Sequence, residues 1–106
     1  MTESSIEELA YKALLVTADY PATYGRIKTA RIIIGLTASV DQEINWSPYI
    51  VEPRPEMTLK STVELIDALI AGGLLTKVAY PRPTLVLTRT GHRALEGLEA
   101  SSPATI

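Results

Sequence analysis

The sequence contains no cysteine, which excludes disulfide bonds and thiolate metal sites. It has one histidine, His92, and no second histidine or cysteine is available to complete a metal site, so we interpret His92 as a structural residue. No serine or threonine is accompanied by a convincing base and orienting group, so nucleophilic catalysis has no support. We therefore expect a protein that is not an enzyme and that holds no metal ion or cofactor.

Long apolar runs are also missing. No stretch approaches the length of a membrane span, and the acidic N-terminus is unlike a signal peptide. We expect an intracellular, cytoplasmic protein or a piece cut from one, without a membrane partner. The 106 residues suit a single domain with one core, and we expect residues 1–4 and 100–106 to be flexible ends.

The sequence has no excess of positive charge, since 10 lysines and arginines stand against 12 acidic residues. The distribution along the chain is uneven, however. Between residues 24 and 93 we count nine basic residues and six acidic ones, so the acidic excess lies in the two ends. A modest basic surface is therefore compatible with the net charge of −2, and such a surface is what nucleic-acid binding requires.

Residues 57–73 predict a helix that is followed by a tight turn. Apolar residues recur at helical spacing over 59–71, and Thr58 precedes them as a natural N-cap. Gly72 and Gly73 supply the positive φ that commonly ends a helix.

The residues after the two glycines predict a β-hairpin. Residues 74–80 and 84–88 alternate with the two-residue period of strands, and Pro81–Arg82–Pro83 forms a stiff tip between them. A helix followed by a hairpin is the back half of a winged helix. We therefore expect the α+β class, as a winged helix-turn-helix whose helices pack on a small antiparallel β-hairpin wing.

A further helix is expected on each side of this unit. Ser5 opens the first helix with a capping box, and this helix ends near Ala18. Thr88 caps the last helix, which continues through Leu98. The apolar face of the first helix consists of Ile6, Leu9, Ala10, Ala13 and Leu14.

The middle of the chain is harder to assign. Three consecutive isoleucines at 32–34 favour a strand by propensity, but residues 26–36 place Ile27, Ala30, Ile33 and Ile34 on one helical face, so we predict a helix. Residues 37–56 have no sustained period and form a long connection, in which 49–51 are a candidate strand pairing with the hairpin. We expect Trp46 to cover the core from this connection.

Three blocks resemble a known family. They are Tyr24–Gly25–Arg26 at the start of the second helix, the block ELIDALIAGGLL at 64–75, and the block TLVLTRTGHRAL at 84–95. The chain resembles the RQC (RecQ C-terminal) domain, the winged-helix module that follows the zinc-binding region in RecQ-family DNA helicases. Together the blocks extend over most of residues 5–98.

The resemblance implies a DNA-binding domain that is not itself catalytic. It implies binding to double-stranded or forked DNA beside a helicase core in the same chain, with phosphates held at helix N-termini and the hairpin wing at the junction where strands separate. DNA repair, replication and recombination at the nucleoid are the corresponding processes. The motor itself is absent from these residues, because the phosphate-binding pattern G-x-x-x-x-G-K-[ST] does not occur.

Two groups of residues are candidates for phosphate contacts. Thr58, Lys60 and Ser61 stand at the start of a helix, where free amides and the positive end of the dipole attract anions. Arg26, Lys28 and Arg31 cluster at the start of the second helix and would neutralise phosphates. We favour the first two of these, because Arg31 is the one that we expect to pair with a carboxylate. Each group is also compatible with an ordinary cap or a solvated basic face.

The hairpin tip and the outer face of the third helix complete the candidate site. Tyr80 is placed to stack on an exposed terminal base pair while Arg82 reaches a phosphate, although Tyr80 is also compatible with cross-strand packing. Glu64 and Asp67 lie on the outer face of the helix and would repel the phosphates that border a major groove, so we do not expect this helix to read bases deeply.

Two other functions stay open. A winged helix that has lost DNA binding and instead contacts a protein partner fits the net acidity and the acidic outer face of the third helix. A small transcriptional regulator is the third hypothesis. It ranks lower, because such a regulator normally needs a dimerisation helix and the first helix is short.

Overall fold

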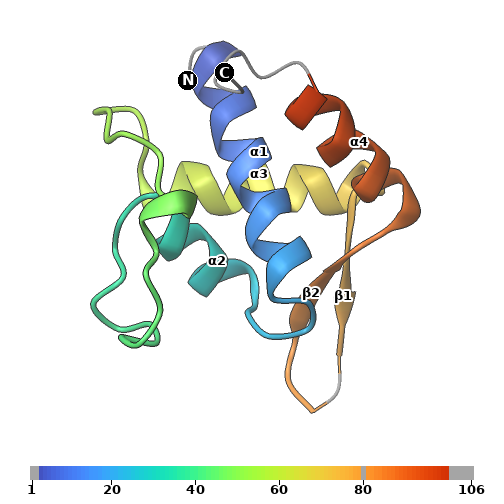
Figure 1. The fold of residues 1–106 in the computed structure, drawn as a ribbon, viewed down its shortest axis with the longest axis horizontal. Coiled ribbons are helices and arrows are strands. Elements are labelled where there is room, and N and C mark those ends of the chain that lie inside the picture. The colour runs from blue at the N-terminus through green and yellow to red at the C-terminus, as the bar shows by residue number, and fades with distance from the viewer. Residues whose placement is uncertain (1–2, 80, 101–106) are drawn as a thin grey trace.

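Four α-helices and one β-hairpin form the part of the chain described by the structure, a computed structural model in which residues 3–79 and 81–100 are described. Helix α1 is central, because it packs against α2, α3, α4 and β2 (Figure 1). The hairpin packs on the helices through contacts of β2 with α1 and α4 and of β1 with α3. The elements are α1 (Glu3–Asp19), α2 (Arg26–Ile33), the 3-10 helix η1 (Ser47–Tyr49), α3 (Leu59–Ala71), β1 (Leu75–Val78), β2 (Thr84–Leu87) and α4 (Arg89–Ala100).

Helix α3 begins and ends where the sequence predicts. The Thr58 hydroxyl accepts the amide of Ser61 at 3.0 Å, and the Ser61 hydroxyl accepts the amide of Thr58 at 3.1 Å, which is a reciprocal capping box. At the other end Gly73 has the predicted positive φ, +79°, a value that glycine adopts at little cost, whereas Gly72 has φ −79° and not the positive φ that was predicted for it. The prediction of Thr58 as N-cap is therefore confirmed.

The hairpin pairs β1 with β2 in the antiparallel sense, with Leu75 opposite Leu87. A third segment lies along the other side of β2, because the Ala22 amide donates to the Leu85 carbonyl at 2.9 Å and the Leu85 amide donates to the Tyr24 carbonyl at 3.0 Å. The strand β2 is thus hydrogen-bonded on both sides, and the loop before α2 is attached to the hairpin.

Helix α4 is capped by Thr88, as predicted. The Thr88 hydroxyl accepts the amide of Gly91 at 3.0 Å, and the Thr88 amide donates to the Leu74 carbonyl at 3.1 Å. A Cβ on Gly91 would lie only 2.0 Å from that carbonyl oxygen, so only glycine fits. Helix α4 continues to Ala100, two residues beyond the predicted end.

The predicted start of α1 is wrong. The helix begins at Glu3, and Ser5 is a fully buried residue within it rather than its cap. The Ser5 hydroxyl accepts a hydrogen bond from Arg54 at 2.7 Å and donates one to Glu56 at 3.2 Å. These partners come from the loop before α3. Ile6 is 40% exposed, so its predicted place on the apolar face is wrong.

Helix α2 confirms the helical prediction for the isoleucine run, since Ile32 and Ile33 are fully buried in it. It ends three residues early, at Ile33. Ile27 is 52% exposed, so its assignment to the buried face is wrong. The buried residues are Thr29, Ala30, Ile32 and Ile33, because α2 turns that side towards α1 and α3.

The predicted strand at 49–51 is wrong as well. Tyr49 ends the 3-10 helix η1, which is favoured by Pro48 in its first turn. The amide of Val51 donates at 2.8 Å to the carbonyl of Ile33 near the end of α2, and not to the hairpin. The long connection therefore closes onto α2.

An aromatic cluster holds this connection against α1 and α2. Trp46 is 5% exposed, which confirms its predicted place over the core, and its ring centroid lies 5.5–5.8 Å from those of Tyr20, Tyr24 and Tyr49. The Tyr24 hydroxyl donates to the Asp41 carboxylate, and the Tyr49 hydroxyl donates to a second carboxylate, Asp19. Burial raises the pKa of both tyrosines, and their carboxylate partners raise it further, so both stay protonated.

Candidate nucleic-acid interface

The hairpin tip touches the start of α2. Gly25 is the N-cap residue of α2, and a Cβ there would lie 2.8 Å from the carbonyl oxygen of Pro83. Since real Cβ atoms do not approach so closely, the contact requires glycine. Gly25 is therefore explained by packing, because the absence of a side chain lets the hairpin lie against the first turn of the helix.

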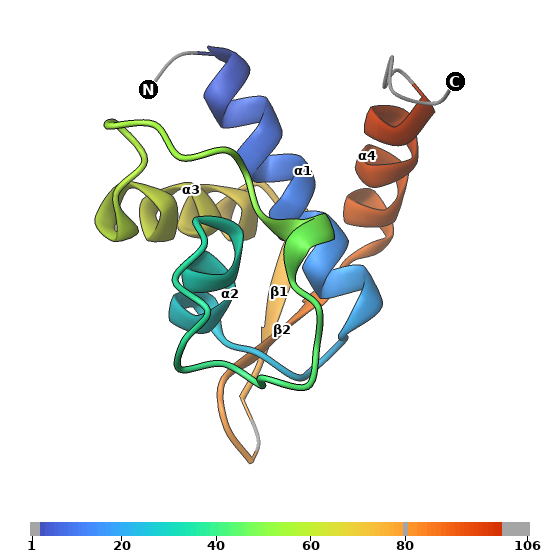
Figure 2. The ribbon, with the colours of Figure 1, turned by 60° about the vertical axis from the view of Figure 1, so that its left-hand side comes forward.

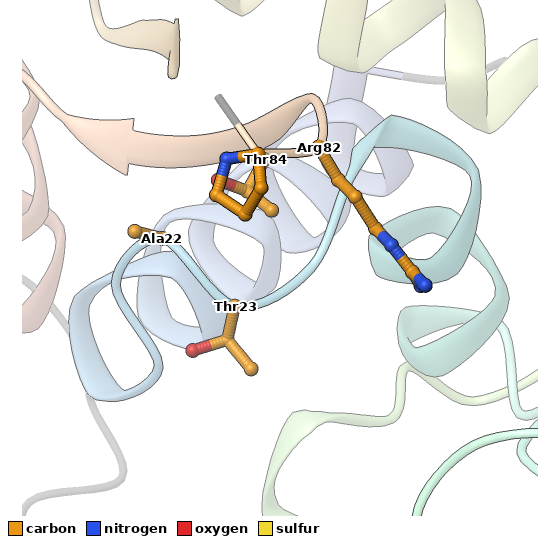
Figure 3. Close-up of a pocket in the computed structure, with 5 residues that line it drawn as sticks. Ala22, Thr23, Arg82 and Thr84 are labelled. Carbon is orange, nitrogen blue, oxygen red and sulfur yellow. The ribbon is translucent and has the colours of Figure 1, made fainter. Parts of the chain in front are cut away.

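Arg82 lines a pocket at this contact. The pocket has a volume of about 300 Å³ and is lined by Ala22, Thr23, Pro81, Arg82 and Thr84. Figure 3 shows side chains from the loop before α2 and from the hairpin around it, with the extended Arg82 on one flank. The sequence singled out Arg82 but not Ala22 or Thr23, because nothing local shows that the loop pairs with β2.

Arg26 is held by a carboxylate. Its guanidinium Nη1 lies 2.6 Å from Oδ1 of Asp67 on α3, and the two side chains are 38% and 48% exposed. An ion pair this exposed stabilises the fold by only about 0–1 kcal/mol, so a phosphate can compete for the arginine. We expected Arg31 to be the cation of this helix that pairs with a carboxylate, and this is wrong, because Arg26 is the one that does.

Lys28 and Arg31 are the other cations of α2. Lys28 is exposed in the first turn, beside Arg26, whereas Arg31 is half-buried one turn later. Within residues 3–79 and 81–100, neither side chain forms an ion pair. Lys28 is therefore the more accessible of the two.

The start of α3 lies at a different place from the hairpin tip. In Figures 1 and 2 the N-terminal end of α3 is the end remote from the hairpin. The side chains of Thr58 and Ser61 are hydrogen-bonded within the capping box. The exposed Lys60 is therefore the charged group at this helix start. The structure thus separates Thr58, Lys60 and Ser61 from the cations at the hairpin.

The outer face of α3 is close to neutral. Lys60, Glu64 and Asp67 are exposed and follow the i, i+4, i+7 spacing of a single stripe, about 10 Å long. With Arg26 held on Asp67, this stripe carries two positive and two negative charges. It offers no net attraction to a phosphate backbone.

Tyr80, the other residue predicted at the wing, lies outside the described residues. Among the residues that are described, no group of three or more histidine, aspartate or glutamate side chains is arranged to hold a metal ion. No described helix has the length and apolar character needed to cross a membrane.

Comparison of the chain with protein-family models, with curated proteins and with solved structures finds no match. The resemblance to the RQC domain therefore stays a prediction that rests on the three sequence blocks.

Proposed function

We propose that this chain is a non-catalytic winged-helix domain that binds double-stranded or forked DNA in the manner expected of an RQC-like module. The four helices and the antiparallel hairpin are compatible with a winged helix, in which α2 and α3 form the helix-turn-helix and β1–β2 form the wing. The segment paired with the outer side of β2 supports this assignment, because it gives the small sheet a third strand-like member.

The contact between Gly25 and Pro83 is the observation that carries the proposal. It brings the hairpin tip with Arg82 to the first turn of α2 with Arg26 and Lys28. These three cations, from two elements, are the phosphate contacts that we propose, with Arg26 taking part once a phosphate displaces Asp67 from it. Each cation that neutralises a phosphate releases a counterion, so three contacts give a slope of about −3 in log K against log salt.

The charge of α3 favours one orientation of the duplex. Glu64 and Asp67 are exposed on its outer face, so deep insertion of α3 into a major groove would bring carboxylates next to phosphates. We therefore propose that the end of the duplex, or a fork, meets the hairpin and the start of α2. Lys60 and the free amides of the first turn of α3 would add a contact to more distant phosphates.

Fluorescence anisotropy with a forked duplex at 50 and 200 mM salt tests the proposal. We expect binding at low salt that weakens steeply at high salt, and a loss of about threefold or more in affinity for Arg82→Ala and for Lys28→Ala. Arg93→Ala is the matched control, because Arg93 is an exposed cation on α4, and this helix lies away from the hairpin tip in Figure 1. Absence of binding at 50 mM salt, or equal losses in all three variants, would refute it.

A protein-binding role is the second candidate. It is favoured by the neutralisation of Arg26 by Asp67 and by the exposure of Ile27 on the same turn of α2, at 52%. Gel filtration with a RecQ-type helicase core tests this role. Co-elution that Ile27→Asp abolishes, in a protein that binds no DNA at low salt, would replace the first proposal with this one.

A further inference from the structure

We propose that the pocket between the hairpin tip and the loop before α2 binds a single unpaired nucleotide at the end of a DNA strand. This inference rests on the proposed function. It adds a binding site for one nucleotide, which attraction between cations and phosphates alone would not require. The pocket is lined by Ala22 and Thr23 from the loop and by Pro81, Arg82 and Thr84 from the hairpin (Figure 3).

The chemistry of the lining matches the parts of a nucleotide. The Ala22 methyl and the Pro81 ring offer apolar surface to the face of a base. The Arg82 guanidinium supplies the positive charge for the adjoining phosphate, and it is exposed at the rim of the pocket. The Thr23 hydroxyl already donates to the Pro21 carbonyl at 3.1 Å and so offers only an acceptor to a ligand, and the Thr84 hydroxyl is a hydrogen-bonding group for a base edge or a sugar oxygen.

The size of the pocket limits what it accepts. A volume of about 300 Å³ lies at the lower end of the range of small-molecule sites, which is roughly 300–1,000 Å³. One nucleotide is of this size and a base pair is not. The unpaired end of a strand is therefore a better match than intact duplex.

The two walls of the pocket are fixed relative to each other before any ligand binds. Two backbone hydrogen bonds join the loop to β2, from Ala22 to Leu85 at 2.9 Å and from Leu85 to Tyr24 at 3.0 Å. Ala22 has φ +53°, an unusual value for a residue with a side chain, and it is held there by the first of these bonds. A site built in advance loses little conformational entropy on binding.

The test compares a blunt duplex with the same duplex carrying a one-nucleotide 3′ overhang, by anisotropy at 50 mM salt. We expect the overhang to bind about fivefold more tightly, since burial of about 40 Å² of a base face against Ala22 and Pro81 is worth about 1 kcal/mol. An overhang of one abasic residue should give no gain. In methyl NMR spectra the overhang, but not the abasic duplex, should shift the signals of Ala22, Thr23 and Thr84.

A variant that fills the pocket provides the control for mechanism. Thr23 is exposed, so Thr23→Tyr is expected to fold, and it should bind the overhang and the blunt duplex with equal affinity. Thr90→Tyr places the same side chain at an exposed threonine on α4 and should keep the gain. Thermal unfolding checks that both variants are folded.

The outcomes separate the two proposals. If the blunt duplex binds and the overhang gives no gain, or if folded Thr23→Tyr keeps the gain, the pocket proposal is overturned and the proposed function stands. If neither duplex binds at 50 mM salt, both fail. Deoxyadenosine monophosphate serves as the free-nucleotide probe. If it shifts the signals of the three methyl-bearing residues and the overhang does not, the pocket binds a free nucleotide, and the proposal that it binds a strand end is overturned.

Discussion

The guanidinium of Arg26 and the carboxylate of Asp67 lie 2.6 Å apart and join the start of α2 to the outer face of α3. The pair removes one cation from the surface that we propose meets DNA. It also neutralises one of the two carboxylates that would repel a duplex from α3. Its energetic contribution to folding is small, since both side chains are more than a third exposed.

Asp67→Asn should therefore increase DNA affinity, by roughly two- to fivefold at low salt, because it releases Arg26 and removes a negative charge. Glu64→Gln is the matched control, as it removes an equal charge from the same stripe but leaves the ion pair in place. If anisotropy titrations show a larger gain in DNA affinity for Asp67→Asn than for Glu64→Gln, the difference is due to the release of Arg26. Equal gains would mean that the ion pair has no role in DNA binding.

Gly91→Ala should destabilise the protein by about 3 kcal/mol or more, because the new methyl group would collide with the carbonyl of Leu74. Gly97 lies on the same helix, and a Cβ there meets no atom within 4 Å. Gly97→Ala should instead stabilise by about 0.5–1 kcal/mol. Urea unfolding of both variants measures the difference, and similar effects on stability would contradict the packing that we describe.

Gly25→Ala should affect both stability and binding. The methyl group would push the Pro83 carbonyl away, at a cost of about 1–2 kcal/mol, and would shift the hairpin tip from the start of α2. We expect DNA affinity to fall several-fold in protein that remains folded at 25 °C. Weaker folding with unchanged DNA affinity would show that the placement of the hairpin tip against α2 does not matter for binding.

The carboxyl group of Glu56 should make the free energy of unfolding depend on pH. A hydrogen bond from its own backbone amide lowers the pKa of this carboxyl, and the Ser5 hydroxyl and the Arg54 charge act in the same direction. Because the folded pKa lies below the unfolded value, the stabilisation is present above the usual glutamate pKa of about 4.3 and is lost as the pH falls through the folded value. The urea concentration at the midpoint of unfolding should decrease as the pH is lowered from 7 to 3. The decrease should be smaller for Glu56→Gln than for the unsubstituted protein. Identical profiles for the two proteins would be evidence against this linkage.

The parts of the fold that follow from local patterns could be predicted from the sequence. Thr58 and Thr88 were recognisable as caps, because a cap bonds to an amide three residues further along the chain. The strands and the glycine turn before them have equally local signals. The helix over the isoleucine run was also predictable, since helical spacing outweighed the β propensity of those residues.

The parts that depend on distant contacts could not be predicted. Ser5 looked like a cap, yet its partners Arg54 and Glu56 come from another loop. Arg26 finds its carboxylate on α3, 41 residues away. The pocket at the hairpin depends on the backbone pairing of Ala22 with β2, which leaves no mark in the sequence.

Amide NMR of the chain titrated with a short forked duplex at low salt tests the central claim most directly, because it shows which end of the molecule meets DNA. We predict that the largest shifts fall in residues 22–28 and 82–84, with smaller ones at the start of α3 and none along α4. Shifts concentrated on α4, or on the stripe from Lys60 to Asp67 with the hairpin unaffected, would contradict the account.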